Sequence, residues 1–242
     1  MPTEPSNADP PKRQRRWYQF SLRTLLIFTV LCAVAASWFG NKIEQKRIER
    51  DAVAAIVEFG GEAHYDYERV YGAKPPGPEW LRKLLGENFF SEVVAVDLRE
   101  SRDADVGLVN VKELPRLDWL FVAGSKATDA GLVNIQGLTQ LQTLSLMNTQ
   151  VTDAGLVDLK TLTGLRRVNL VATKVTDAGL ECLKGLNQLQ LLILAETNVT
   201  DAGLENLKGL TRLQKLDLRD TKVTEAGVND LQKALPNCDI VR

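Results

Sequence analysis

The sequence predicts an α/β solenoid, a right-handed coil of six 24-residue strand–helix units over residues 93–242 with one parallel sheet. Two observations predict it. Aliphatic residues recur at positions 1, 4, 6, 16 and 19 of each unit, and a Thr-Asp-Ala-Gly element recurs between them. The units begin at Val93, Leu117, Leu141, Leu165, Leu189 and Leu213. A fixed period of this length is typical of stacked units that share one core.

Within each unit, a short strand precedes a helical segment. Positions 4 and 6 alternate with positions 3, 5 and 7, which predicts a strand with one buried face. Positions 16, 19 and 22 recur at helical spacing. In Thr152-Asp153-Ala154-Gly155, the Thr is expected to cap the N-terminus of the helix. The Asp lies in the first turn, where the helix dipole favours a negative charge. Gly137, Gly185 and Gly209 are expected to end helical segments.

Two polar columns run through the repeats. Position 9 is Ser or Thr from Ser101 to Thr221, which either satisfies backbone groups of the neighbouring coil or is simply a good turn residue. The aspartates of the Thr-Asp elements suggest calcium as an alternative, but helix capping explains them with fewer assumptions. These aspartates are Asp129, Asp153, Asp177 and Asp201. We therefore expect no metal and no cofactor.

A solenoid must cover both ends of its core. At the C-terminal end, Pro236 stops the last helix and Ile240 falls on position 4 of a closing strand. Residues 41–92 are predicted to be a stalk and N-terminal cap, with a helix at 42–59, a strand at 62–67 and a helix at 79–90. One side of the first helix carries Ile48, Ala52, Val53, Ile56 and Val57. Trp80 and Phe89 are expected in the core.

The N-terminal residues predict a membrane anchor. Residues 1–19 are rich in Pro and polar residues and are expected to be a disordered basic tail. Residues 20–40 are apolar except for Arg23, long enough for a transmembrane signal anchor in a lipid bilayer. Trp17, Tyr18 and Trp38 would suit the two interfaces. The alternative is a signal peptide cleaved at residues 33–35, which would release a secreted repeat protein.

Flanking charge gives the orientation. Five Lys or Arg residues precede the apolar run and four follow it closely, so the positive-inside rule slightly favours a cytoplasmic N-terminus. We therefore expect a single-pass protein of the cell inner membrane with its repeats on the non-cytoplasmic side.

The repeat pattern LxxLxLxxTxVTDAGLxxLxxL resembles the leucine-rich repeat superfamily. The Thr-Asp-x-Gly-Leu element is similar to the ribonuclease-inhibitor-like and cysteine-containing subclasses, although this chain has Ser or Thr at position 9 in place of Asn or Cys. The basic tail, the segment Ser21-Leu22-Arg23-Thr24-Leu25-Leu26 and the repeats together resemble membrane-anchored leucine-rich repeat proteins of planctomycete bacteria. The resemblance implies a protein-interaction scaffold and no substrate.

Composition argues against several function classes. Lys and Arg number 30 against 31 Asp and Glu, which gives no basic excess for nucleic acid. His64 is the only histidine, and the three cysteines have no paired spacing, so an enzyme is not expected. His64 is interpreted as structural. Cys182 and Cys238 fall on opposite faces, so no disulfide is expected between them.

The strand positions that point away from the leucines give the candidate partner-binding site. The candidates are Trp119, Phe121, Met147, Arg167, Leu191 and Ile193. Large apolar groups at solvated positions often mark interaction sites, although strand propensity alone would also favour them. Trp119 and Phe121 would lie roughly 15 Å from Leu191 and Ile193. That separation favours a protein or extended polymer over a small ligand. The predicted function is a membrane-tethered scaffold, the alternative is a non-specific envelope spacer, and the oligomeric state is left open.

Overall fold

The computed structural model describes residues 22–70 and 73–242, which belong to two compact units, Met1–Lys42 and Ile43–Arg242. The predicted tail, and the first two residues of the predicted anchor, lie outside the described residues. Helix α1 (Leu22–Glu58) runs from the first unit into the second. From Leu22 onwards, the predicted anchor therefore continues without a break into the helix predicted at 42–59, which ends at Glu58.

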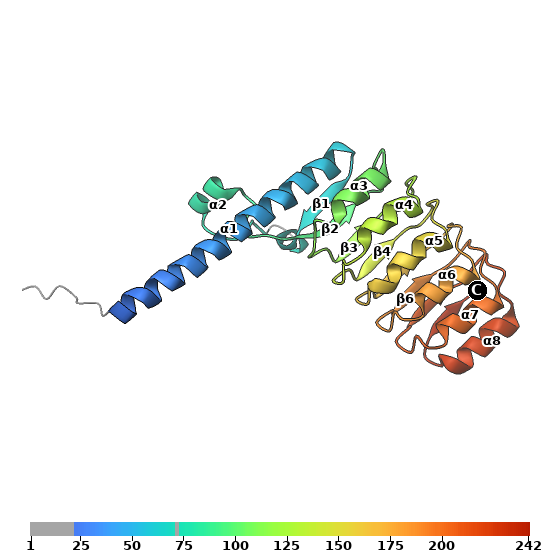
Figure 1. Ribbon diagram of the computed structural model, residues 1–242. Helices are drawn as coiled ribbons and strands as arrows, with labels where there is room; N and C mark the ends of the chain where they lie inside the picture. Colours follow the sequence, from blue (N-terminus) through green and yellow to red (C-terminus); the bar gives the residue numbers. More distant parts are fainter. Residues whose placement is uncertain (1–21, 71–72) are drawn as a thin grey trace, which may run out of the picture. The chain divides into compact units, whose positions relative to one another are not determined.

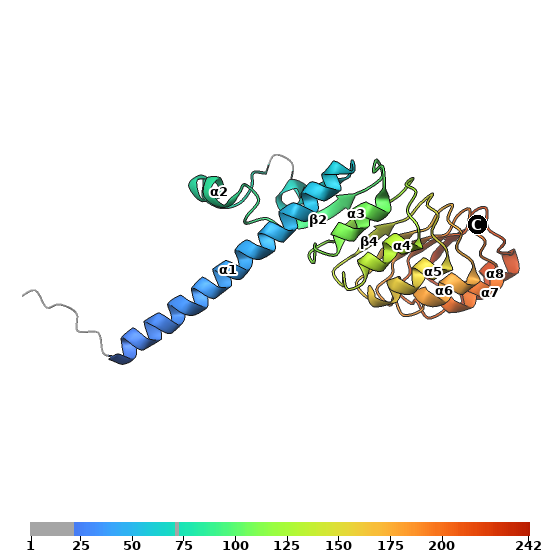
Figure 2. The same cartoon turned by 45° about the horizontal axis from the view of Figure 1, so that its top comes forward.

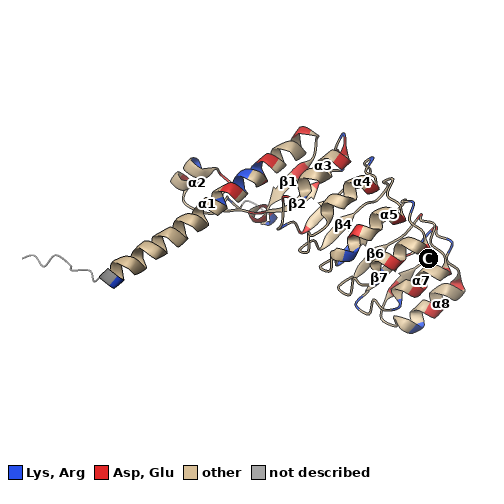
Figure 3. Ribbon diagram, viewed as in Figure 1, with Lys and Arg blue, Asp and Glu red and all other residues tan. Residues whose placement is uncertain are grey.

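The described part of the first unit is an apolar helix. Figure 3 shows that its ribbon carries no charged residue between Arg23 and Lys42. Leu25, Phe28, Leu31 and Trp38 are each more than half exposed. By length and composition, α1 could cross a membrane, as an anchor or as a signal sequence.

The second unit is built on one sheet with the strand order β1 to β8 (Figure 1). The strands are β1 (Glu62–Tyr65), β2 (Val93–Asp97), β3 (Trp119–Phe121), β4 (Thr143–Ser145), β5 (Arg167–Asn169), β6 (Leu191–Ile193), β7 (Lys215–Asp217) and β8 (Asp239–Val241). From β2 onwards each strand is parallel to the next, and Leu120 pairs with Leu144, which pairs with Val168. The predicted parallel sheet and the closing C-terminal strand are confirmed.

Helical segments cover one face of this sheet (Figures 1 and 2). They are α3 (Ala104–Val111), α4 (Asp129–Leu132), η2 (Val133–Ile135), α5 (Asp153–Leu156), η3 (Val157–Thr161), α6 (Asp177–Leu180), η4 (Glu181–Leu183), α7 (Asp201–Leu204), η5 (Glu205–Leu207) and α8 (Glu225–Ala234). In the middle units one α-helical turn continues as a 3₁₀ turn. Leucines at positions 4, 6, 16 and 19, such as Leu144, Leu146, Leu156 and Leu159, are fully buried between the sheet and these segments.

Neighbouring units are joined on the helical side by a ladder of Asp–Thr contacts. Both carboxylate oxygens of Asp129 accept hydrogen bonds from Thr152, one from the backbone N–H at 2.8 Å and one from the hydroxyl at 2.6 Å. The Thr hydroxyl also caps its own helix by accepting from Ala154 N. The same pairing joins Asp105 to Thr128, Asp153 to Thr176, Asp177 to Thr200, and Asp201 to Thr224.

The ladder also explains the recurrent glycine and supplies a role for the aspartates. A Cβ atom on Gly155 would lie 2.5 Å from Asp129 Oδ1 and 3.0 Å from Leu132. At the last rung, hydrogen bonds from the side chain and then the backbone of Thr224 lower the pKa of Asp201. The aspartates were expected to act through the helix dipole, but their main contacts are hydrogen bonds to the next unit.

Two sets of turn residues can be compared with their predictions. The position-9 hydroxyls donate to a carbonyl of their own unit three residues earlier, as Thr173 does to Leu170 O at 2.7 Å, and not to the neighbouring coil. Ser101 differs, because it donates to Phe59 O. Gly137, Gly185 and Gly209 each follow the end of a helical segment as predicted, Gly137 with a positive φ of 83°.

The N-terminal cap also departs from prediction. Strand β1 pairs antiparallel with β2, and of the predicted α1 side only Ala52 and Ile56 are buried, whereas Ile48 and Val57 are exposed. The second cap helix, α2 (Glu79–Leu85), ends before Gly86, which has a φ of 107°. Phe89 is buried as predicted, but Trp80 is 68% exposed, so its assignment to the core was wrong. The short helix leaves Trp80 on its outer side.

Lys46 fixes the cap to α1 through buried polar contacts. Its ammonium lies 2.7 Å from Glu49 and 3.1 Å from Glu92, and it also donates to the carbonyl of Ser91. A buried charge is stable only when it is paired and hydrogen-bonded in this way. The contacts therefore hold the segment before β2 against the helix.

The ladder predicts that substitution by alanine destabilises the protein at Gly155 but not at Gly185. Gly155→Ala should lower the free energy of unfolding by about 1–3 kcal/mol, because the added methyl group displaces Asp129. Gly185→Ala is the matched control, since none of the described atoms would lie within 4 Å of its Cβ. Thermal unfolding of the full chain in mild detergent, followed by circular dichroism, compares them. Equal stability of the two variants would contradict the proposed need for space.

Position 8 predicts a stabilising change. Asn148, Ala172, Glu196 and Asp220 all have positive φ, which costs energy for residues other than glycine. Ala172→Gly should raise the free energy of unfolding by about 0.5–1 kcal/mol. Ala178→Gly, within helix α6, should lower it by a similar amount. Urea unfolding distinguishes the two, and a loss of stability in Ala172→Gly would show that backbone strain is not limiting.

Candidate functional site

The face of the sheet opposite the helical segments carries the candidate site, and we call it the strand face. Strand register aligns its outward side chains in two rows. One row is His64, Ala95, Trp119, Thr143, Arg167, Leu191 and Lys215, and the other is Glu62, Asp97, Phe121, Ser145, Asn169, Ile193 and Asp217. Because register fixes these rows, the strand face has a set spacing of about 4.8 Å per strand.

Trp119 and Phe121 lie in contact on β3. Their ring centroids are 6.5 Å apart at an interplanar angle of 75°, an edge-on arrangement that aromatic pairs favour. The guanidinium of Arg69 lies 5.2 Å from the centre of Trp119, and that of Arg99 lies 5.6 Å from the centre of Phe121. We call these four residues the aromatic cluster. Trp119 remains 40% exposed, so the cap covers the cluster only in part.

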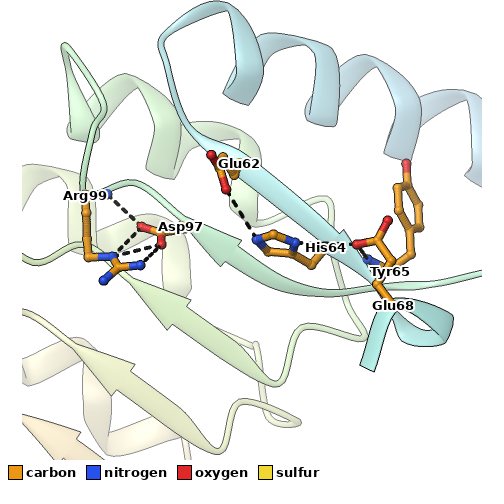
Figure 4. Close-up of polar contacts among 6 residues, drawn as sticks. All are labelled: Glu62, His64, Tyr65, Glu68, Asp97 and Arg99. Carbon is orange, nitrogen blue, oxygen red and sulfur yellow. Dashed lines mark hydrogen bonds and ion pairs between the residues drawn. The ribbon is translucent and has the colours of Figure 1, made fainter. Parts of the chain in front are cut away.

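Both arginines of the aromatic cluster are held by carboxylates. Arg69 lies 2.6 Å from Asp118, and Arg99 forms a forked pair with Asp97, with its Nε 2.8 Å from Oδ2 (Figure 4). Burial raises the pKa of Asp97, but the hydrogen bonds from Arg99 outweigh that effect and bring the pKa below its ordinary value. These pairs keep the guanidinium groups over the rings, where cation–π attraction adds to their placement.

The other candidate residues lie further along the strand face. Leu191 and Ile193 are half-buried on β6, three strands from the aromatic cluster and so roughly 15 Å away. Arg167, on β5, is exposed and pairs in register with Leu191. Met147 follows β4 and is 40% exposed. The structure therefore brings Trp119 and Phe121 together but keeps them apart from the β6 pair.

Sequence reasoning missed the contribution of the cap to this face. His64 pairs in register with Ala95, and its ring lies between Glu62, 3.6 Å from Nε2, and Glu68, 3.5 Å from Nδ1 (Figure 4). The imidazole is half exposed, so the interpretation of His64 as only structural overlooked its place on the strand face. Alternation in residues 62–65 puts Glu62 and His64 on one face, but no pattern gave the antiparallel direction of β1.

A shallow cleft opens between β1 and β3, and we call it the slot. It has a volume of about 270 Å³, Ala95 forms part of its floor, and His64 stands opposite Trp119 and Phe121. Arg69 and Arg99 also line it. The slot exists because Ala95 is small and lies in the same row between two ring-bearing residues.

Carboxylates and cysteine thiols are the groups of this chain that could hold a metal ion or react. Within residues 22–70 and 73–242, no group of three His, Cys, Asp or Glu side chains is placed to hold a metal ion. Cys32, Cys182 and Cys238 are free thiols. Burial raises the pKa of the Cys238 thiol to about 11, which keeps it protonated and a poor nucleophile.

Comparison with known proteins gives one likeness to describe. The chain matches no protein-family model and no curated protein. Among solved structures it is similar to internalin C2 from Listeria monocytogenes str. 4b F2365, with 30% identity over 55% of this chain and 54% of that chain, at a TM-score of 0.47. The chain thus spans about half the length of that protein. Its own strand–helix units, parallel sheet and buried leucine columns define a leucine-rich repeat fold.

Proposed function

We propose that this chain is a membrane-tethered protein-interaction scaffold whose six 24-residue units present the strand face to a partner. The aromatic cluster is the observation that carries the proposal. Trp119 is 40% exposed on β3, and aromatic and Arg side chains are the residues that most often anchor interfaces. The fold itself does not need a tryptophan at this position, because Thr143 and Lys215 occupy the same row on other strands.

A protein or an extended polymer is the favoured partner. The apolar groups on β3 and β6 are separated by roughly 15 Å, a span that an extended segment or a helix covers and a small metabolite does not. Arg167 stands on β5, between these groups, as an exposed cation. Nucleic acid is not favoured, because basic and acidic residues are balanced over the chain.

The proposed tether is the predicted anchor, residues 20–40, which the structure describes from Leu22 onwards as the apolar part of α1. Its described side chains are exposed, and such a surface is favourable in lipid and unfavourable in water. The flanking basic residues support a single-pass protein of the inner membrane with the repeats on the non-cytoplasmic side. The resemblance to membrane-anchored leucine-rich repeat proteins agrees with this arrangement.

The strand-face proposal predicts which surface a partner needs. The full chain, immobilised in mild detergent, should capture a partner from a cell-envelope extract, and Trp119→Ala with Ile193→Ala should abolish that capture. Both side chains are partly exposed, so the melting temperature should change little. Val133→Ala with Val157→Ala, a pair of exposed apolar residues on the helical face, is the matched control and should retain capture. Capture that survives the strand-face change would assign binding elsewhere.

The tether predicts resistance to alkaline carbonate extraction. The full chain should stay in the membrane pellet, because residues 20–40 would be inserted in the lipid. A peripheral envelope protein in the same sample is the control and should be released. Release of the chain, or a mature N-terminus near Ala36, would contradict the anchor and favour a cleaved signal peptide.

A further inference from the structure

We propose that the slot over Ala95 receives one aromatic side chain of a protein partner, from an extended segment that places Lys or Arg two residues to either side. This inference rests on the proposed function of the strand face and names the partner chemistry for it. It also makes the N-terminal cap part of the binding site, because His64 and Glu68 come from residues 62–69.

The spacing of the rows gives the slot its shape. His64, Ala95 and Trp119 are successive members of one row, so the two rings stand two strand spacings apart, about 10 Å. Ala95 is only 7% exposed and brings a single methyl group to the floor. An aromatic ring inserted between His64 and Trp119 would contact both walls and the methyl group, which makes a desolvated anchor site.

The volume decides the kind of ligand. About 270 Å³ lies just below the roughly 300–1,000 Å³ of typical small-molecule sites, and the slot is partly open to solvent. It therefore suits one side chain whose backbone stays outside, as in peptide recognition on a sheet face.

Charge around His64 favours a basic segment. Glu62 and Glu68 both approach the imidazole, and their side chains are 72% and 36% exposed. Two carboxylates against one imidazole leave negative charge to be matched by the partner. The nearby arginines are already paired, Arg69 with Asp118 and Arg99 with Asp97. In an extended segment, residues two apart point the same way, so cations at these spacings would face the glutamates on either side of the ring.

The single histidine provides a direct assay. The full chain in detergent micelles is titrated with the peptide acetyl-Lys-Gly-Phe-Gly-Lys-amide while the Hε1 signal of His64 is followed by NMR. An inserted phenyl ring should move this signal by its ring current. The Ala-centred peptide, acetyl-Lys-Gly-Ala-Gly-Lys-amide, should not move it, and the Glu-flanked Phe peptide should bind more weakly.

Two variants of the chain test the position of the ring. Ala95→Leu fills the slot and should weaken the response to the Phe peptide by about tenfold or more, the scale of losing an anchor residue. Thr143→Leu adds an apolar side chain to the same row outside the slot and should leave the response unchanged. Thermal unfolding of both variants checks that they remain folded.

The outcomes separate this inference from the broader proposal. A His64 response that is absent at millimolar peptide, equal for the Phe and Ala peptides, or unaffected by Ala95→Leu would overturn the slot. If capture in the Trp119 and Ile193 experiment still depends on the strand face, the proposed function stands without it. If Ala95→Leu does not fold, Ala95→Val, which also narrows the slot, takes its place with the same expected direction.

Discussion

The hydrogen bonds that each Asp carboxylate accepts from the Thr of the next unit are the contacts on which the regularity of the repeats depends. A carboxylate that accepts from both a backbone N–H and a hydroxyl has its two oxygens fixed, and charged acceptors make the stronger hydrogen bonds. Each Thr also caps the helix that follows it. One pair therefore sets the step between units, starts a helix and requires glycine where the carboxylate passes.

This fixed step on the helical side leaves the strand face free to vary. The sheet keeps a constant register from β2 to β8 because leucines fill the interior and the ladder holds the outer turns. Outward positions do not contribute to either contact. One row can therefore hold alanine at 95, tryptophan at 119 and arginine at 167 without a change in backbone geometry. Outward side chains on this face can therefore be substituted to bind a partner with little loss of stability.

Periodicity predicted the repeated strand–helix units but not the features of the N-terminal cap, which occur only once. The strands, their parallel order and the closing strand followed from aliphatic columns, because every unit has the same packing problem. Trp80 was misplaced because a seven-residue helix in the cap has no repeated pattern to orient it. The role of the aspartates was only half predicted, since capping is local and visible in sequence, whereas the bond to Thr in the next unit is not. The side of the sheet reached by His64 depended on an antiparallel pairing that no periodicity encodes.

The cap therefore has two physical roles that use different residues. Ala52 and Ile56 of α1 cover the open end of the leucine core, where exposed apolar surface would otherwise face water. On the other side of the sheet, β1 adds His64 and Glu62 to the strand face, and the turn after it delivers Arg69 to Trp119. An end strand that only closed the core would not need two charged or ionisable side chains, Glu62 and His64, on its solvent face. Ala52 and Ile56 lie on the core side of the sheet, whereas His64, Glu62 and Arg69 lie on the strand face. Changes on the strand face can therefore alter recognition while the end of the core stays covered.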